Sequence, residues 1–164
     1  MPIGENIIGA SGLAPFFKIS NPDDFDIRPP AICEGDALQC RIRSLSGFQK
    51  EAIVASARTG LVWRLVSDEG AYLDGHDAAP CPLAFLSAGM VASYLDEILA
   101  LAGQQGIEIR YIRLVQDNYY TMKGSMQRRT MVGGALPVEL AVEVDCDLDD
   151  AALNQLLMDA VHAS

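Results

Sequence analysis

The stretch from Pro80 to Gly106, PCPLAFLSAGMVASYLDEILALAGQQG, constrains the fold more than any other part of the chain. Prolines at its beginning favour a helix start, and Gly103 and Gly106 supply stop signals. Apolar residues occupy nearly every side of this helix until Asp96 and Glu97 interrupt them. Because a helix that is apolar all round is usually buried, we expect it to be wrapped by a sheet, by other helices or by a second subunit.

The length, the net charge and the distribution of apolar and basic residues exclude several classes of protein. A chain of 164 residues is expected to form one domain, and its formal net charge of −10 opposes binding to nucleic acid. No uninterrupted apolar run reaches the roughly 20 residues that a membrane span requires. No basic residue precedes Lys18, so the basic region of a secretory signal is missing. We therefore expect a cytoplasmic protein with neither nucleic acid nor membrane as a partner.

The cysteines do not form a recognisable site. They show no C-x-x-C spacing and no clustered histidine, so we expect no metal and no cofactor. Scattered cysteines in a reducing compartment are mostly small buried hydrophobes. We interpret all four in this way: Cys33, Cys40, Cys81 and Cys146.

The first half of the chain is interpreted as a strap followed by three strands. Residues 1–36 are rich in proline but carry apolar side chains that disordered segments lack, so this strap is expected to pack on the body or on a partner subunit. Residues 37–164 form the domain proper. Alternating residues from Ala37 predict a half-buried strand with Leu38, Cys40 and Ile42 on its apolar face, and two more strands, Glu51 to Ala57 and Leu61 to Val66, complete a meander. Trp63 is expected in the core.

The second half continues the antiparallel pattern. A loop dense in Gly, Asp and Pro, Ser67 to Pro82, leads to the helix. A long strand is predicted from Ile107 to about Met122, followed by a connection over residues 123–134. A last strand, around Val138 to Val144, is predicted to have one solvent-exposed face. Asp147, Asp149 and Asp150 cap a final amphipathic helix. This order predicts an α+β fold with antiparallel sheets around a long buried central helix.

Three features together resemble a known family. They are Ser67-Asp68-Glu69 followed by Gly75 and Pro80-x-Pro82-Leu83, the long helix with a small residue near its middle, and the late strand and helix. Over about Ala37 to Ser164 the chain resembles the OsmC-like proteins, which include the organic hydroperoxide resistance proteins. The resemblance implies an intertwined homodimer with the helix at its centre and, in enzymatic members, a two-cysteine peroxidase.

Both cysteine positions that the resemblance implies hold serine. Counting eleven residues from Pro82 gives Ser93, and the second position falls at or next to Ser164. A peroxidatic thiolate attacks the O–O bond and becomes a sulfenic acid, which a second thiol converts to a disulfide; a serine hydroxyl performs neither step. The family also implies a Glu where Leu83 stands and an arginine near the first cysteine, for which the candidates are Arg41, Arg43, Arg58 and Arg64.

Other side chains could act as nucleophile or base, but each also has a simpler role. Cys81 lies just before the helix start, where exposed N–H groups favour a thiolate, although no other cysteine has a position that suggests a resolving partner. Ser93 sits inside a helix, where it is expected to bond a backbone carbonyl one turn back, and His76 is interpreted as a loop histidine.

These sequence features are compatible with three functions. The preferred one is an OsmC-like homodimer without cysteine-based peroxidase activity that binds a small ligand in a pocket beside the central helix. The first alternative is a thiol-dependent hydroperoxide reductase that uses a relocated thiol, Cys81. The second is a structural or interaction module that acts through the acidic surface and the strap.

Overall fold

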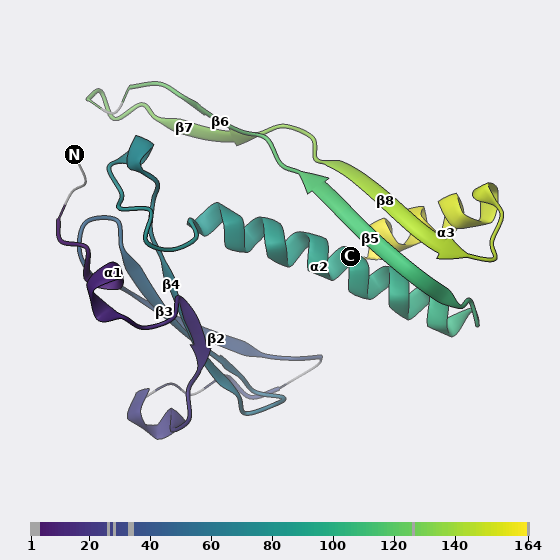
Figure 1. The fold of residues 1–164 in the computed structure, drawn as a ribbon, viewed down its shortest axis with the longest axis horizontal. Coiled ribbons are helices and arrows are strands. Elements are labelled where there is room, and N and C mark those ends of the chain that lie inside the picture. Colours follow the sequence, from purple (N-terminus) through teal and green to yellow (C-terminus); the bar gives the residue numbers. More distant parts are fainter. Residues whose placement is uncertain (1–3, 26, 28, 33–34, 126, 164) are drawn as a thin grey trace. The chain divides into compact units, whose positions relative to one another are not determined.

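The computed structural model describes residues 4–25, 27, 29–32, 35–125 and 127–163. The chain divides into two compact units, Met1–Phe85 and Leu86–Ser164, which are described separately below. Figure 1 gives the order of the elements along the chain. Every sheet in both units is antiparallel, as the sequence predicted.

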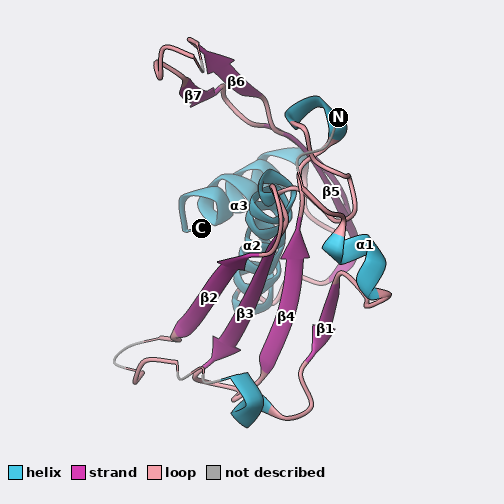
Figure 2. Ribbon diagram, turned by 90° about the vertical axis from the view of Figure 1, so that its left-hand side faces the viewer, coloured by secondary structure: helices cyan, strands magenta, loops and turns pink. Residues whose placement is uncertain are grey.

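The first unit is built on a four-stranded sheet. The predicted meander is confirmed as β2 (Leu38–Ser44), β3 (Lys50–Ser56) and β4 (Val62–Ser67). A short strand of the strap, β1 (Phe16–Lys18), pairs with β4. The strand order is therefore β1-β4-β3-β2, which Figure 2 shows as four neighbouring strands. The prediction did not include β1, because three residues are too few to show a period of two.

The strap forms part of the core of this unit. Ile19 and Ile27 are buried in one cluster with Ile53, Ala55 and Val62 of the sheet. Before and after β1 the strap forms the short helices α1 (Ile7–Ser11) and η1 (Pro22–Phe25). The expectation that the strap packs on the body is therefore confirmed for its buried isoleucines.

The other face of the sheet is open, which corrects two expectations. Trp63 is 40% exposed and does not lie in the core, while Leu38 and Ile42 are exposed at 63% and 62%. Cys40, on the same face, is exposed as well. The reason is the strap, which covers the opposite face. Side chains alternate along a strand, so Val62, Arg64 and Val66 of β4 are buried on the covered face, and Trp63 points away from them.

The predicted long helix is confirmed as α2 (Pro82–Gln104), 23 residues long. It stops where Gly106 adopts a left-handed conformation with φ of 68°, which glycine allows without steric cost. Its buried residues are Ile98 and Ala102, so the burial expected along the whole helix is seen near its C-terminal end. By length and composition α2 could also cross a membrane, contrary to the sequence expectation, although a core helix of a soluble protein meets the same test.

The second unit contains two paired ribbons. The strands β5 (Ile109–Asp117) and β8 (Glu139–Cys146) form one pair, and β6 (Tyr120–Lys123) and β7 (Val132–Ala135) form the other. The single long strand expected up to Met122 is thus interrupted after Asp117, and β7 begins inside the expected connection. In β8 half-buried and exposed residues alternate, as predicted.

The chain then enters α3 (Asp150–Ala163), the predicted final helix. Asp149 caps it, because its carboxylate accepts a hydrogen bond of 2.8 Å from the N–H of Ala152. Leu156 and Ala160 are its buried residues.

Candidate ligand pocket

The open face of the sheet changes from apolar to polar toward one end. The strand register places Ile42 opposite Ala52, and Ala52 opposite Leu65, which makes an apolar row across three strands. In the next row on the same face Lys50 lies between Ser44 and Ser67. This polar row stands where β4 ends and the loop toward α2 begins.

A hollow of about 280 Å³ lies over these rows at the start of α2. Its volume is close to the lower limit for small-molecule sites. Its walls are mainly apolar, and all of its residues belong to the first unit. They are Ile42, Lys50, Ala52, Val54, Leu65, Val66, Ser67, Pro82 and Phe85. We call this hollow the sheet pocket.

The polar end of the sheet pocket consists of Lys50 and Ser67. Among the described residues the hydroxyl oxygen of Ser67 is buried and has no hydrogen-bond partner, in a residue that is 9% exposed. The Lys50 ammonium donates one hydrogen bond of 2.6 Å to the carbonyl of Phe48 and lies 3.6 Å from a Glu69 carboxylate oxygen. The lining therefore includes one residue with a buried orphan hydroxyl and one with an ammonium that has N–H groups to spare.

The loop that follows the pocket is held by Asp68, which is fully buried. Its carboxylate accepts hydrogen bonds from the backbone N–H groups of Glu69, His76 and Ala78, at 2.8, 3.2 and 3.3 Å. Gly75 is required in the same loop because a Cβ there would collide with the carbonyl of Glu69. The Ser-Asp-Glu and Gly75 features of the sequence thus serve to fold the loop that leads to α2.

A buried amide ties this loop to the beginning of the strap. The Gln49 side chain donates hydrogen bonds to Asp68 at 3.2 Å and to the side-chain oxygen Oδ1 of Asn6 at 2.8 Å, and it accepts one of 3.0 Å from the N–H of Ile8. Asn6 in turn caps α1. His76 adds a contact of 3.1 Å between its Nε2 and the carbonyl of Gly4, which gives this histidine a structural position.

These contacts also fix the charge of Asp68. Burial opposes the charged form, but the hydrogen bonds from Gln49 and from the N–H groups of Ala78, Glu69 and His76 outweigh it, so the pKa of Asp68 lies below its ordinary value. The residue is a carboxylate at neutral pH.

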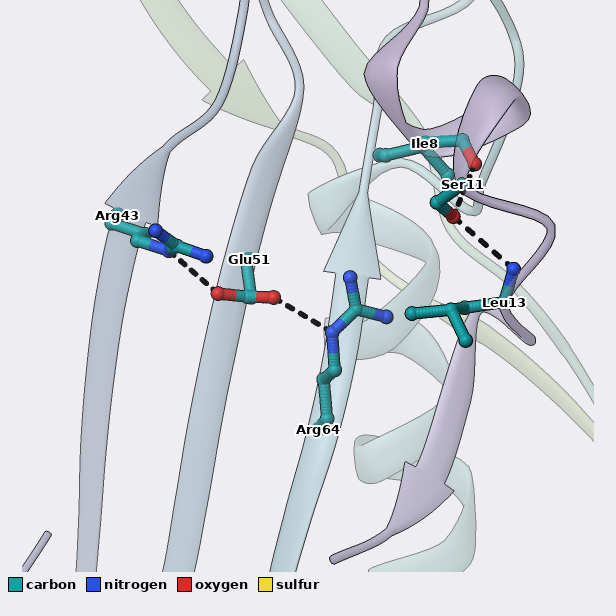
Figure 3. A network of polar contacts seen from close by, with 6 residues as sticks. All are labelled: Ile8, Ser11, Leu13, Arg43, Glu51 and Arg64. Carbon is teal, nitrogen blue, oxygen red and sulfur yellow. Dashed lines mark hydrogen bonds and ion pairs between the residues drawn. The ribbon is translucent and has the colours of Figure 1, made fainter. Parts of the chain in front are cut away.

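The opposite face of the sheet carries a separate ionic network, shown in Figure 3. Glu51 accepts a hydrogen bond of 2.6 Å from Arg43 and one of 2.7 Å from Arg64. Burial raises the pKa of Glu51, but the two guanidinium groups lower it by more, and the net pKa lies below the ordinary value. The Arg64 guanidinium also lies 5.4 Å from the centre of the Phe17 ring. Figure 3 further shows Ser11, which bonds the carbonyl of Ile8 at the end of α1.

The four arginine candidates all lie outside the sheet pocket. Arg41 and Arg64 each pair with Ile53 in the strand register, on the face that the strap covers, and Arg43 pairs there with Glu51. Arg58 bonds the carbonyl of Gly35 next to a turn. None of these four arginines lines the sheet pocket.

Of the two cysteine positions that the resemblance implies, the structure describes one. Ser93 lies on α2, exposed, in the second unit, and Ser164 falls outside the described residues. Leu83, in the position where the resemblance implies a Glu, is 42% exposed in the first turn of α2. Among the described residues no group of three metal-ligating side chains is found.

The candidate thiol Cys81 lies beside a different hollow, of about 310 Å³. Its lining includes Tyr72, of the short helix η2 (Ala71–Leu73), and Asp77. Among the described residues no second cysteine lines this hollow. Cys33 lies outside the described residues.

Sequence reasoning missed the two polar residues of the pocket. The sequence pattern places Ser67 in the loop and Lys50 before the predicted strand, whereas both belong to strands and lie on the open face. Extending the period-two pattern of Val54 and Ala52 by one step reaches Lys50 and would have found it.

The architecture defines the class of fold before any comparison, namely a mixed α/β fold with antiparallel sheets and one long helix between them in sequence. The sequence matches no family model and no curated protein. Solved structures do match, at low sequence identity.

One similar structure is that of the organic hydroperoxide resistance protein OsmC from Legionella pneumophila. It is 18% identical, with a TM-score of 0.55 over 76% of this chain and 83% of that chain. A second is an osmotic stress induced and detoxification response protein from Psychrobacter arcticus 273-4, 15% identical, with a TM-score of 0.53 over 74% and 80% of the two chains. An OsmC-like hydroperoxide resistance protein from Jannaschia sp. CCS1 gives a TM-score of 0.47 at 19% identity, over 78% and 81%. The two structures with TM-scores above 0.5 show that the chain has an OsmC-like fold.

Proposed function

We propose that this OsmC-like chain binds a small, mainly apolar ligand in the sheet pocket and does not reduce hydroperoxides through cysteines at the positions implied by the resemblance. The observation that carries the proposal is the sheet pocket itself, an apolar hollow of about 280 Å³ beside the first turn of α2. An apolar pocket with few polar groups is the usual form of a small-ligand site.

Ser93 supports the second half of the proposal. The Legionella pneumophila protein is described as an organic hydroperoxide resistance protein, and thiol-based reduction of a hydroperoxide requires a thiolate. The position implied for that thiolate holds a hydroxyl in this chain.

We also propose that the partner of the chain is a second copy of itself. The resemblance implies an intertwined homodimer, and the chain leaves several apolar surfaces open. Large exposed side chains occur on the open sheet face outside the pocket lining, on α2 and along the β6–β7 ribbon, for example Leu38, Leu86 and Val132. Monomeric proteins rarely leave so much apolar surface in contact with water, and a two-stranded ribbon is marginally stable alone.

The strap is less suited to a separate interaction role. Ile19 belongs to the core cluster and β1 to the sheet. Deleting residues 1–36 would therefore remove part of the fold as well as any docking segment.

Ligand binding is tested by filling the pocket. The fluorescence of an apolar dye such as anilinonaphthalene sulfonate is titrated with the wild-type protein and with Ala52→Phe, which places a ring in the hollow. We expect Ala52→Phe to lose most of the dye binding. The matched control is Ala141→Phe, on the exposed face of β8, which should bind as wild type does. Equal binding by all three proteins would contradict the proposal.

The absence of peroxidase chemistry is tested with cumene hydroperoxide and dihydrolipoamide. We expect no consumption above the reductant blank and no oxidised thiol in the mass spectrum afterwards. Rapid turnover that Cys81→Ser abolishes would instead establish the alternative, a relocated peroxidatic thiol.

A further inference from the structure

We propose that the ligand of the sheet pocket is an amphipathic carboxylic acid whose carboxylate binds Lys50 and Ser67 while its chain lies over the apolar row. This inference rests on the proposed function, since it names the chemical class of ligand for the same pocket. Three independent features of the first unit support it.

The first feature is the orphan hydroxyl of Ser67. A buried hydroxyl without a partner is costly, by about 1–3 kcal/mol, and this one belongs to a residue that lines the pocket. A turn about the Cα–Cβ bond moves a serine hydroxyl between staggered positions at small cost. A ligand oxygen that accepts a hydrogen bond would give it the partner that the chain lacks.

The second feature is Lys50, which lies opposite Ser67 on the neighbouring strand. Its contact with Glu69 is 3.6 Å long, longer than a hydrogen bond, and only one of its three N–H groups is used by the carbonyl of Phe48. Lys50 can therefore donate to a second anion. Because Lys50 and Ser67 are paired in the strand register, their ammonium and hydroxyl groups supply donors for the two oxygens of one carboxylate.

The third feature is the first turn of α2, which contributes Pro82 and Phe85 to the pocket. The N-terminal end of a helix carries partial positive charge and favours an anion. Beyond the polar row the pocket becomes apolar, with Ile42, Ala52 and Leu65 in one row. A polar end followed by an apolar floor is the arrangement that an acid with a hydrocarbon chain requires.

The test compares two ligands with the same chain and different heads. Octanoate and 1-octanol are titrated into the full chain by calorimetry, and the emission of Trp63, which pairs with Val54 of the pocket wall, serves as a second signal. We expect octanoate to bind about tenfold more tightly than octanol, because a charged acceptor strengthens both hydrogen bonds.

Variants separate the head-group contact from a general effect of charge. Lys50→Met should abolish the preference for octanoate, Lys50→Arg should retain most of it, and Ser67→Ala should reduce it. The control is Lys18→Met, which removes a positive charge from the same sheet outside the pocket lining and should leave the preference unchanged.

The outcomes distinguish this inference from the proposed function. If octanol and octanoate bind equally well, the carboxylate assignment is wrong while the apolar pocket remains a ligand site. If Lys18→Met removes the preference as completely as Lys50→Met does, the effect is general electrostatics and the assignment is again wrong. If neither ligand binds and the dye does not bind either, both proposals fail.

Discussion

At the scale of single residues, burial decides what each charged group contributes. Arg43 and Arg64 bond the same carboxylate over similar distances, 2.6 and 2.7 Å, but their side chains are 70% and 9% exposed. An exposed ion pair contributes little because water competes for both charges. Removing one partner of a buried pair leaves an uncompensated charge in a poorly solvated place.

We therefore expect Arg64→Met to lower the free energy of unfolding by about 3 kcal/mol, and Arg43→Met, the same exchange at the exposed position, by less than about 1 kcal/mol. Urea unfolding followed by circular dichroism measures both. Equal losses for the two variants would show that the burial of Arg64 has no energetic effect.

Asp68 makes stability depend on pH. Its pKa is lowered in the folded chain, so its contribution is present above the unfolded pKa of about 3.9 and is lost as the pH falls through the folded value. We expect Asp68→Asn to lower the free energy of unfolding at pH 7 by about 1–3 kcal/mol. Between pH 7 and 3 the free energy of unfolding of this variant should fall by less than that of the wild type. Denaturant titrations between pH 7 and 3 measure this difference.

The control for this measurement is Asp117→Asn, at an exposed aspartate at the end of β5. It should change stability by no more than about 0.5 kcal/mol and should follow the wild-type pH profile. A profile for Asp68→Asn that also parallels wild type would contradict the role assigned to Asp68.

At the scale of elements, α2 and the open sheet face share one property, since each has more apolar surface than the described chain covers. In α2 the exposed residues include Leu86 and Leu99, although the helix is apolar enough to be a core element. A helix of this kind is stable in water when another surface covers it. The proposed second copy would supply that surface.

This predicts that the chain is a dimer in solution. The double variant Leu86→Glu, Leu99→Glu should raise the dissociation constant of the dimer at least tenfold, because burying two carboxylates in the interface costs well over about 1.4 kcal/mol of binding free energy. Sedimentation velocity over a range of concentrations measures the shift. Leu13→Glu, at another exposed leucine, is the control and should leave the dimer intact. A wild-type monomer at all concentrations would refute the proposal.

At the scale of the whole molecule, the chain has an OsmC-like fold and consists of two units, each with its own antiparallel pairing. The order of elements was predictable because it depends on local signals. The period-two pattern of Val142 and Val144, the prolines before α2 and the Asp149 cap are all read within a few residues.

Local signals also account for where the predictions failed. The alternation in β4 shows that Trp63 and Arg64 lie on opposite faces, but it does not show which face is covered. Hydrophobicity favours burial of Trp63, whereas the strap covers the side of Arg64. There Arg64 pairs with Glu51 of β3 and lies over the ring of Phe17, which belongs to the strap. Which face is buried depends on a segment some forty residues earlier in the chain, through contacts such as Ile19 with Val62.

The sequence alone was enough for the succession of strands and helices, the antiparallel class and the serine at position 93, since each depends on neighbouring residues or on identity at one position. The residues that line the sheet pocket could not be predicted from the sequence. Lys50 and Ser67 become neighbours through strand register, and Pro82 and Phe85 join them through the loop that Asp68 and Gln49 hold together. Contacts between residues distant in sequence create that site, and no local pattern encodes them.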